Sequence, residues 1–249
     1  RTKIRSVTIS DGITSLPAEI FSGCENLVSV TIPDSVTEIG AFAFRGCTSL
    51  ATIRLPKDLT RVETGTFLGD AALGTVNIPD GVTVICTDAF RGCTALKQIT
   101  LPAGLEKIGV GTFAFCTSLE KISMPASVRA VPDDAFYGCA GLTQVGSVGG
   151  IVTVGNNAFR GCENLAALDF SEKLISVGDM AFAGCVSLSD YALSGMTSIG
   201  TDAFLHVPAK ESLSLYLSEK DLASFCEGHA DFSLTGAKSF RLFVDGREV

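Results

Sequence analysis

The 249-residue chain lacks tryptophan, and it contains only two histidines and three tyrosines. It also lacks any stretch of 18 or more consecutive apolar residues, which excludes a typical membrane-spanning helix from this segment. Lysine and arginine number 19 against 27 aspartates and glutamates, so the net charge is −8. Because the basic residues are scattered, we expect no nucleic-acid partner and no attraction to an anionic membrane surface.

The amino-terminal region, residues 1–20, lacks the charged and then apolar pattern of a signal peptide. The sequence begins at Arg1 rather than at a methionine. We therefore expect a mature form or a trimmed part of a longer protein, without its signal or anchor. The first predicted strand region, from Ile4 to Ile9, has no preceding residues that would shield its apolar side chains from water. We therefore expect that a further capping segment precedes it in the longer protein.

The sequence does contain a repeat of 23 residues. A fixed period of this length indicates a repeat fold, so we consider it before assigning secondary structure. Glycine is frequent, with 26 residues, which favours tight turns over long helices. Phenylalanine follows the period at Phe21, Phe44, Phe67, Phe90, Phe113, Phe136, Phe159 and Phe182, and after one shorter step at Phe204. Leucine follows it at Leu27, Leu50, Leu73, Leu96, Leu119, Leu142, Leu165 and Leu188.

Each repeat contains two extended pieces and a turn. In L-x-x-I-x-L-P the last two apolar residues alternate as in a strand, and the proline that follows ends the strand. A second apolar pair, such as Val36 and Ile39, indicates another extended piece that ends in a turn. We interpret the Ala-Phe-x-Gly-Cys segment, as in residues 43–47, as one short helical or 3₁₀ turn, because its Phe and Cys share a face.

These patterns predict an α/β-type solenoid: a right-handed superhelix with a parallel β-sheet, short helical turns and a C-terminal cap. One repeat cannot bury its apolar face alone, whereas coils stacked at the ~4.8 Å strand spacing bury a continuous core. The handedness follows the general preference for right-handed crossovers. We assign residues 1–204 to a solenoid of about nine coils and residues 205–249 to the C-terminal capping segment.

The capping segment and three departures from the repeat complete this interpretation. In the cap we expect strands over 212–217 and 240–244, and a helix that begins at Ser218 as its N-cap and ends at Cys226. Asp70 replaces the cysteine of the repeat, and Phe115 replaces the glycine. Residues 146–150 lack the usual proline, which predicts a local irregularity or bulge.

Seven of the nine cysteines lie on the repeat period, at Cys24, Cys47, Cys93, Cys116, Cys139, Cys162 and Cys185. Neighbouring coils could bring pairs within disulfide range, but the number is odd and the column faces the core. We interpret them as inert, buried free thiols, and Cys86 and Cys226 as the better candidates for exposure. So many unpaired thiols fit poorly with an oxidising exterior, a tension that an anaerobic habitat would resolve.

The whole pattern, F-x-x-C-x-x-L-x-x-I-x-L-P-x-x-L-x-x-I-G-x-x-A-F over about residues 4–204, resembles the BspA-like leucine-rich repeats of bacterial and protist surface proteins. The resemblance implies a curved solenoid and an extracellular or cell-surface location. It also implies a role in adhesion or protein binding, with a protein or glycan as ligand.

No pattern typical of catalysis or of cofactor binding is present. His206 and His229 lie in the cap region, and a triad of His206 with Ser212 lacks any motif for an oxyanion hole. The sequence has no P-loop and no dinucleotide fingerprint. The cysteines lack the short spacing of metal ligands. We therefore expect no enzyme, no cofactor, and no catalytic or metal-binding residues.

The candidate binding face consists of the outward positions on the predicted sheet, which are small, polar and mostly uncharged. They are Ser29, Thr31, Thr52, Arg54, Thr75, Asn77, Gln98, Thr100, Lys121 and Ser123. The leading hypothesis is a non-catalytic binding module for adhesion or protein–protein interaction. The alternative is a structural spacer whose sheet is merely solvated and which displays a neighbouring segment. A glycan-acting or other enzyme comes third, because paired catalytic carboxylates are not identifiable.

Overall fold

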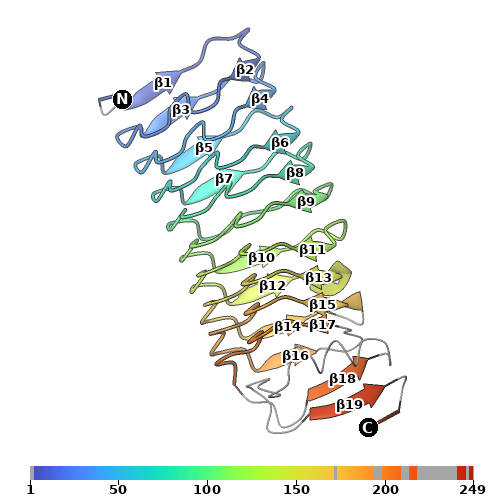
Figure 1. Ribbon diagram of the computed structural model, residues 1–249. Helices are drawn as coiled ribbons and strands as arrows, with labels where there is room; N and C mark the ends of the chain where they lie inside the picture. The colour runs from blue at the N-terminus through green and yellow to red at the C-terminus, as the bar shows by residue number, and fades with distance from the viewer. Residues whose placement is uncertain are drawn as a thin grey trace.

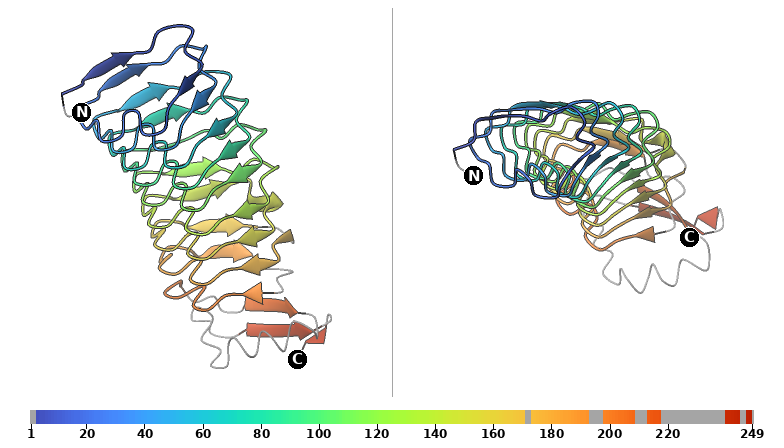
Figure 2. Two further views of the ribbon diagram at one scale, coloured as in Figure 1. Left: turned by 45° about the horizontal axis from the view of Figure 1, so that its top comes forward. Right: turned by 90° about the horizontal axis from the view of Figure 1, so that it is seen from above.

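The structure, a computed structural model, describes residues 3–170, 173–192, 198–208, 213–217, 240–244 and 247–248. The chain winds into coils that stack along one axis, with β1 at one end and β18 and β19 near the other (Figure 1). Viewed from above, successive coils are offset rather than superimposed (Figure 2). Each coil has three sides, which are two strand ladders and a side made of turns.

The first ladder contains the strands predicted from the L-x-x-I-x-L pattern, and it confirms them. Its strands pair in parallel, so that Ser6 lies opposite Ser29 and Thr52 opposite Thr75. The middle residue of each described strand in the coils from 29 to 123 is buried, and its two neighbours are exposed. The strands are β1 (Ser6–Thr8), β3 (Ser29–Thr31), β5 (Thr52–Arg54), β7 (Thr75–Asn77), β10 (Lys121–Ser123), β12 (Gln144–Gly146), β14 (Ala167–Asp169) and β16 (Asp190–Ala192).

The second ladder contains two-residue strands and confirms the second extended piece of the repeat. These strands also pair in parallel with the period of the repeat, as Leu16 with Ile39 and Val62 with Ile85. They are β2 (Ser15–Leu16), β4 (Glu38–Ile39), β6 (Arg61–Val62), β8 (Val84–Ile85), β9 (Lys107–Ile108), β11 (Ala130–Val131), β13 (Thr153–Val154), β15 (Ser176–Val177) and β17 (Ser198–Ile199).

On the turn side, residues 41–50 and their copies, the short helical turns expected from the sequence are not confirmed. The described Ala-Phe-x-Gly-Cys segments form hydrogen-bonded turns and not short helices. Alternate N–H groups donate to the next coil, as from Phe44 to the Thr66 carbonyl oxygen at 2.9 Å, and the others close turns, as from Cys47 to the Phe44 carbonyl oxygen at 3.0 Å. Two residues in each coil also have positive φ, such as Phe42 at 57° and Gly46 at 70°, which interrupts right-handed helix.

The core lies between the three sides and confirms the predicted stacking of equivalent side chains. Phenylalanine rings of successive coils stack with centroids 5.1 to 5.7 Å apart. The column leucines from Leu27 to Leu188 are fully buried. Within the described residues, the seven column cysteines are buried free thiols. Offset aromatic stacking and continuous apolar burial therefore hold adjacent coils together.

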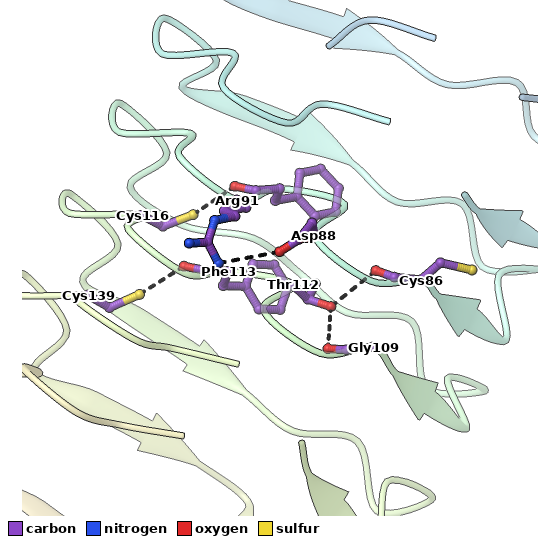
Figure 3. Close-up of polar contacts among 9 residues, drawn as sticks. Cys86, Asp88, Arg91, Gly109, Thr112, Phe113, Cys116 and Cys139 are labelled. Atoms are coloured by element: carbon purple, nitrogen blue, oxygen red, sulfur yellow. Dashed lines mark hydrogen bonds and ion pairs between the residues drawn. The ribbon is translucent and has the colours of Figure 1, made fainter. Parts of the chain in front are cut away.

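Six of the column cysteines each donate a hydrogen bond to the carbonyl oxygen of a phenylalanine in the preceding coil. Cys116 donates its S–H to the carbonyl oxygen of Phe90 at 3.2 Å, and Cys139 donates to that of Phe113 at 3.0 Å (Figure 3). Burial raises the pKa of Cys139 to about 12, so this thiol is protonated and unreactive at neutral pH. The repeat therefore selects cysteine as a small apolar side chain that is also a weak donor.

Residues 146–150 contain the predicted irregularity, in the form of a 3₁₀ helix rather than a bulge. This helix, η1 (Val148–Gly150), follows Ser147, which has a φ of 59°. The neighbouring strands β12 and β14 pair at one position, Gln144 with Ala167. Loss of the usual proline thus coincides with a local change in the turn that follows the first ladder.

The C-terminal region includes both predicted strands. β18 (Leu213–Leu217) pairs in parallel with β19 (Phe240–Val244), and β20 (Arg247–Glu248) pairs antiparallel with β19. The predicted helix over 218–226 lies outside the described residues, as do Ser212, Cys226 and His229. The boundary at residue 204, the capping role of residues 205–249 and the handedness of the superhelix remain predictions.

Candidate binding surfaces

The sequence-predicted residues come together on one surface of the first ladder, and all ten are exposed. From Thr52 to Lys121, parallel register places equivalent residues of neighbouring coils opposite each other, including Asn77 opposite Thr100 and Gln98 opposite Lys121, whereas β3 stands in a separate sheet from β5. The result is two rows. One contains Ser29, Thr52, Thr75, Gln98 and Lys121, and the other contains Thr31, Arg54, Asn77, Thr100 and Ser123.

These two rows, hereafter the sheet face, offer mainly hydroxyl and amide groups on a fixed backbone. Thr75 and Thr52 hydroxyls lie 3.3 Å apart within hydrogen-bond distance. The Arg54 guanidinium donates to Asp34 at 2.9 Å, and this hydrogen bond lowers the pKa of that carboxyl. Such groups can form many adaptable hydrogen bonds to a ligand. They include no paired nucleophile and base.

A groove beside the second ladder was missed by the sequence analysis. It has a volume of about 420 Å³ and is lined by the first three coils. On one wall, Arg61 forms an ion pair with Glu63 at 2.8 Å and a contact with the Cys86 sulfur at 3.2 Å. Burial and the charge of Glu63 raise the pKa of the Cys86 thiol, and the Arg61 hydrogen bond opposes them. This half-buried cysteine is thus not activated as a nucleophile.

A second surface that sequence reasoning missed lies on the turn side and joins four consecutive coils. The Arg91 guanidinium carbon lies 5.0 Å from the centre of the Phe115 ring. That ring meets Tyr137 edge to face at 4.9 Å. The Arg160 guanidinium carbon lies 5.7 Å from the centre of the Tyr137 ring. We call these four residues the aromatic–arginine cluster.

Phe115 is unusual in both conformation and exposure. Its φ is 60°, at a position that the neighbouring coils fill with Gly92 and Gly138. A bulky residue in this left-handed region costs about 1–2 kcal/mol. The residue is 37% exposed, so part of its apolar surface stays in contact with water. A Cβ at Gly138 would lie 2.8 Å from Phe115 Cδ1. The absence of a side chain at Gly138 therefore makes room for the Phe115 ring. The departure at Phe115 was visible in the sequence, but the partners were not.

Asp70 is a buried ionisable group in the cysteine column. Its side chain is fully buried, Oδ1 accepts a hydrogen bond from the Cys47 N–H at 2.8 Å, and Oδ2 has no partner. Burial raises the pKa of Asp70 to about 8, although the N–H groups of Cys47 and Gly46 act in the opposite direction. A cysteine here would donate to the Phe44 carbonyl oxygen, and only a protonated carboxyl can donate in its place. Asp70 is therefore mainly neutral at pH 7.

The described residues contain no group of three or more side chains able to hold a metal ion. The buried Thr112 hydroxyl is 2.7 Å from the Gly109 carbonyl oxygen and 3.2 Å from that of Cys86, so it satisfies the turn (Figure 3). His206 takes the position of the repeat glycine in its coil, with a φ of 63°. In the part of the chain that the structure describes, no helix has the length and apolar character needed to cross a bilayer.

Parallel coils with stacked Phe, Leu and Cys columns define a leucine-rich repeat protein. The model of the BspA type leucine-rich repeat region matches residues 1–119 and 83–210, with six copies. The chain therefore belongs to the BspA-type leucine-rich repeat family. This family and fold are typically non-catalytic binding scaffolds. Comparison with curated proteins finds no significant match.

Solved structures of two bacterial proteins share the fold. A leucine-rich repeat protein from Bacteroides ovatus is 25% identical with a TM-score of 0.71, and the match covers 96% of this chain and 66% of that one. A leucine rich cell surface protein from Faecalibacterium prausnitzii is 27% identical with a TM-score of 0.58, and the match covers 98% and 74%. The chain thus spans roughly two thirds of the Bacteroides protein.

Proposed function

We propose that this chain is a non-catalytic binding module, displayed outside the cell or at its surface, that contacts a protein or glycan through the sheet face. The observation that carries the proposal is the arrangement of ten exposed side chains in two in-register rows. The inter-coil hydrogen bonds and the packed core hold these rows in place, so that little freedom is lost on binding. Similarity to the Faecalibacterium cell surface protein supports the location.

The test is a binding screen of the whole chain against arrays of purified extracellular proteins and glycans. A variant with alanine at Thr52, Arg54, Gln98 and Lys121 alters the sheet face alone. We expect it to lose capture of the ligand but to unfold at nearly the same temperature, since exposed substitutions away from the core change stability little.

A matched control changes exposed residues in or beside the second ladder and away from the groove, with alanine at Lys107, Arg129 and Thr153. It removes the same number of positive charges as the sheet-face variant, and we expect its capture of ligand to be unchanged. Equal binding by wild type and the sheet-face variant would reject the sheet face as the site. Failure of the wild type to bind any array component would favour a spacer that displays a neighbouring segment.

A further inference from the structure

The aromatic–arginine cluster contains a costly feature that the fold does not require. Seven described coils use glycine at the position of Phe115, namely Gly23, Gly46, Gly69, Gly92, Gly138, Gly161 and Gly184, all with positive φ. The coil therefore closes without a side chain there. A phenylalanine that is in a left-handed conformation and 37% exposed points to a role outside the fold.

The two guanidinium groups of the cluster are held in place before any ligand arrives. Arg91 stacks near the Phe115 ring and contacts Asp88 at 3.5 Å. Arg160 lies near the Tyr137 ring and donates to the Asn157 side chain at 3.2 Å. Within the described residues the hydrogen bonds of both arginines use Nη1, so their Nε and Nη2 hydrogens stay available for an acceptor. The long contact of Arg91 with Asp88 can be exchanged for a ligand carboxylate.

We propose that this cluster binds an extended segment of a partner protein, with two carboxylates four residues apart and an apolar side chain midway between them. Arg91 and Arg160 are three coils apart, which corresponds to ~14 Å at the ~4.8 Å spacing of strands. An extended chain rises ~13 Å over four residues, and alternate side chains point the same way. The carboxylates then meet the two guanidinium groups, and the apolar side chain meets Phe115 and Tyr137.

The geometry favours a peptide over a sugar chain. A guanidinium group lies over each of the Phe115 and Tyr137 rings, and the two rings are inclined at 62°, so they form no continuous platform for successive sugar rings. Guanidinium and carboxylate groups pair through two parallel hydrogen bonds, which fixes the direction of approach. Tyrosine and arginine are also the residues that most often dominate protein–protein binding. This surface lies on the turn side, so it is a second contact region, separate from the sheet face.

The experiment uses the whole chain and a fluorescent peptide, Ser-Glu-Thr-Leu-Thr-Glu-Ser, followed by fluorescence anisotropy at low and at physiological salt. We expect saturable binding that weakens with salt. F115G should lower the affinity about tenfold, the loss typical of a central contact. It should also raise the melting temperature, because it restores the repeat glycine. R91Q and R160Q should each lower the affinity several-fold and reduce the salt dependence.

Two controls separate this proposal from that of the sheet face. A peptide with glutamine at both glutamate positions should not bind, and R54Q combined with K121Q should bind the first peptide as wild type does. The proposal is overturned if the wild type fails to bind the peptide, if F115G binds equally well, or if F115G lowers the melting temperature. Binding of heparin but not of the peptide, through the same arginines, would also overturn it. Each of these results leaves the array test of the sheet face unaffected.

Discussion

Replacement of Asp70 by asparagine should stabilise the protein, and increasingly so as the pH rises. Asparagine has nearly the same shape as aspartate, and its carbonyl oxygen can keep the hydrogen bond from the Cys47 N–H. Its amide N–H₂ can donate to the Phe44 carbonyl oxygen. The equivalent phenylalanine carbonyl oxygens in other coils accept a hydrogen bond from a cysteine S–H. The substitution therefore removes an ionisable group from the core without opening a cavity.

The magnitude follows from the two pKa values of Asp70. The folded value is about 8, and the unfolded value is ~3.9. Between these values the native state holds a proton that the unfolded chain has released, so the stability contributed by neutral Asp70 falls as pH rises. The slope is about 1.4 kcal/mol per pH unit. This contribution is complete below about pH 4 and lost by about pH 8, with an upper limit of about 5–6 kcal/mol.

The assay is urea unfolding of wild type and D70N between pH 4.5 and 8.5, followed by far-ultraviolet circular dichroism. The difference between the two proteins isolates Asp70, because all other titrating groups are shared. We expect the two stabilities to converge at the acid end and D70N to be the more stable at the alkaline end. D70C, which restores the column thiol, should show the same trend. Parallel pH profiles, or a D70N that is less stable at pH 8, would refute the reasoning.

Three further predictions concern packing. F90A should lower the free energy of unfolding by about 3–5 kcal/mol through a core cavity, and a small change in urea unfolding would contradict the ring stack. Among the described cysteines, a thiol reagent such as dithionitrobenzoate should label only Cys86 in the native protein, whereas rapid labelling of the column would exclude burial. G138A should lower the melting temperature, because its Cβ would lie 2.8 Å from Phe115 Cδ1. When G138A is introduced into F115G, the melting temperature should fall less. An equal fall in both backgrounds would show that the Phe115 ring is not the cause.

The two strand ladders could be predicted because their signals recur at a fixed interval. Ile53 and Leu55 alternate with exposed Thr52 and Arg54, and the other copies from Val30 to Met124 repeat the alternation, whereas Ser147 departs from it. A single such segment would be ambiguous, but its repetition fixes both the strand and its parallel neighbour. The ten residues of the sheet face were located correctly for the same reason, although their role in binding remains a proposal.

The turn side could not be predicted in the same way. Its first left-handed position is occupied by residues as different as Glu19, Phe42, Asp134 and Met180, so residue type gives no consistent signal. The inter-coil hydrogen bonds that replace a helix depend on those backbone angles. The aromatic–arginine cluster depends on them too, because its members come from four coils and meet only after the turns are placed. A resemblance to a repeat family supplies the average coil and not such individual departures.

The hydrogen bonds between coils have a consequence for how such chains change length. On the turn side each one joins residues separated by nearly a full repeat, as Phe44 to Thr66 and Phe67 to Ala89. Excision of residues 90–112 would bring Phe113 to the place of Phe90, beside the same kind of neighbour. Whole units can thus be lost or duplicated by recombination with only one new junction to accommodate, which makes reach a readily altered property of this protein.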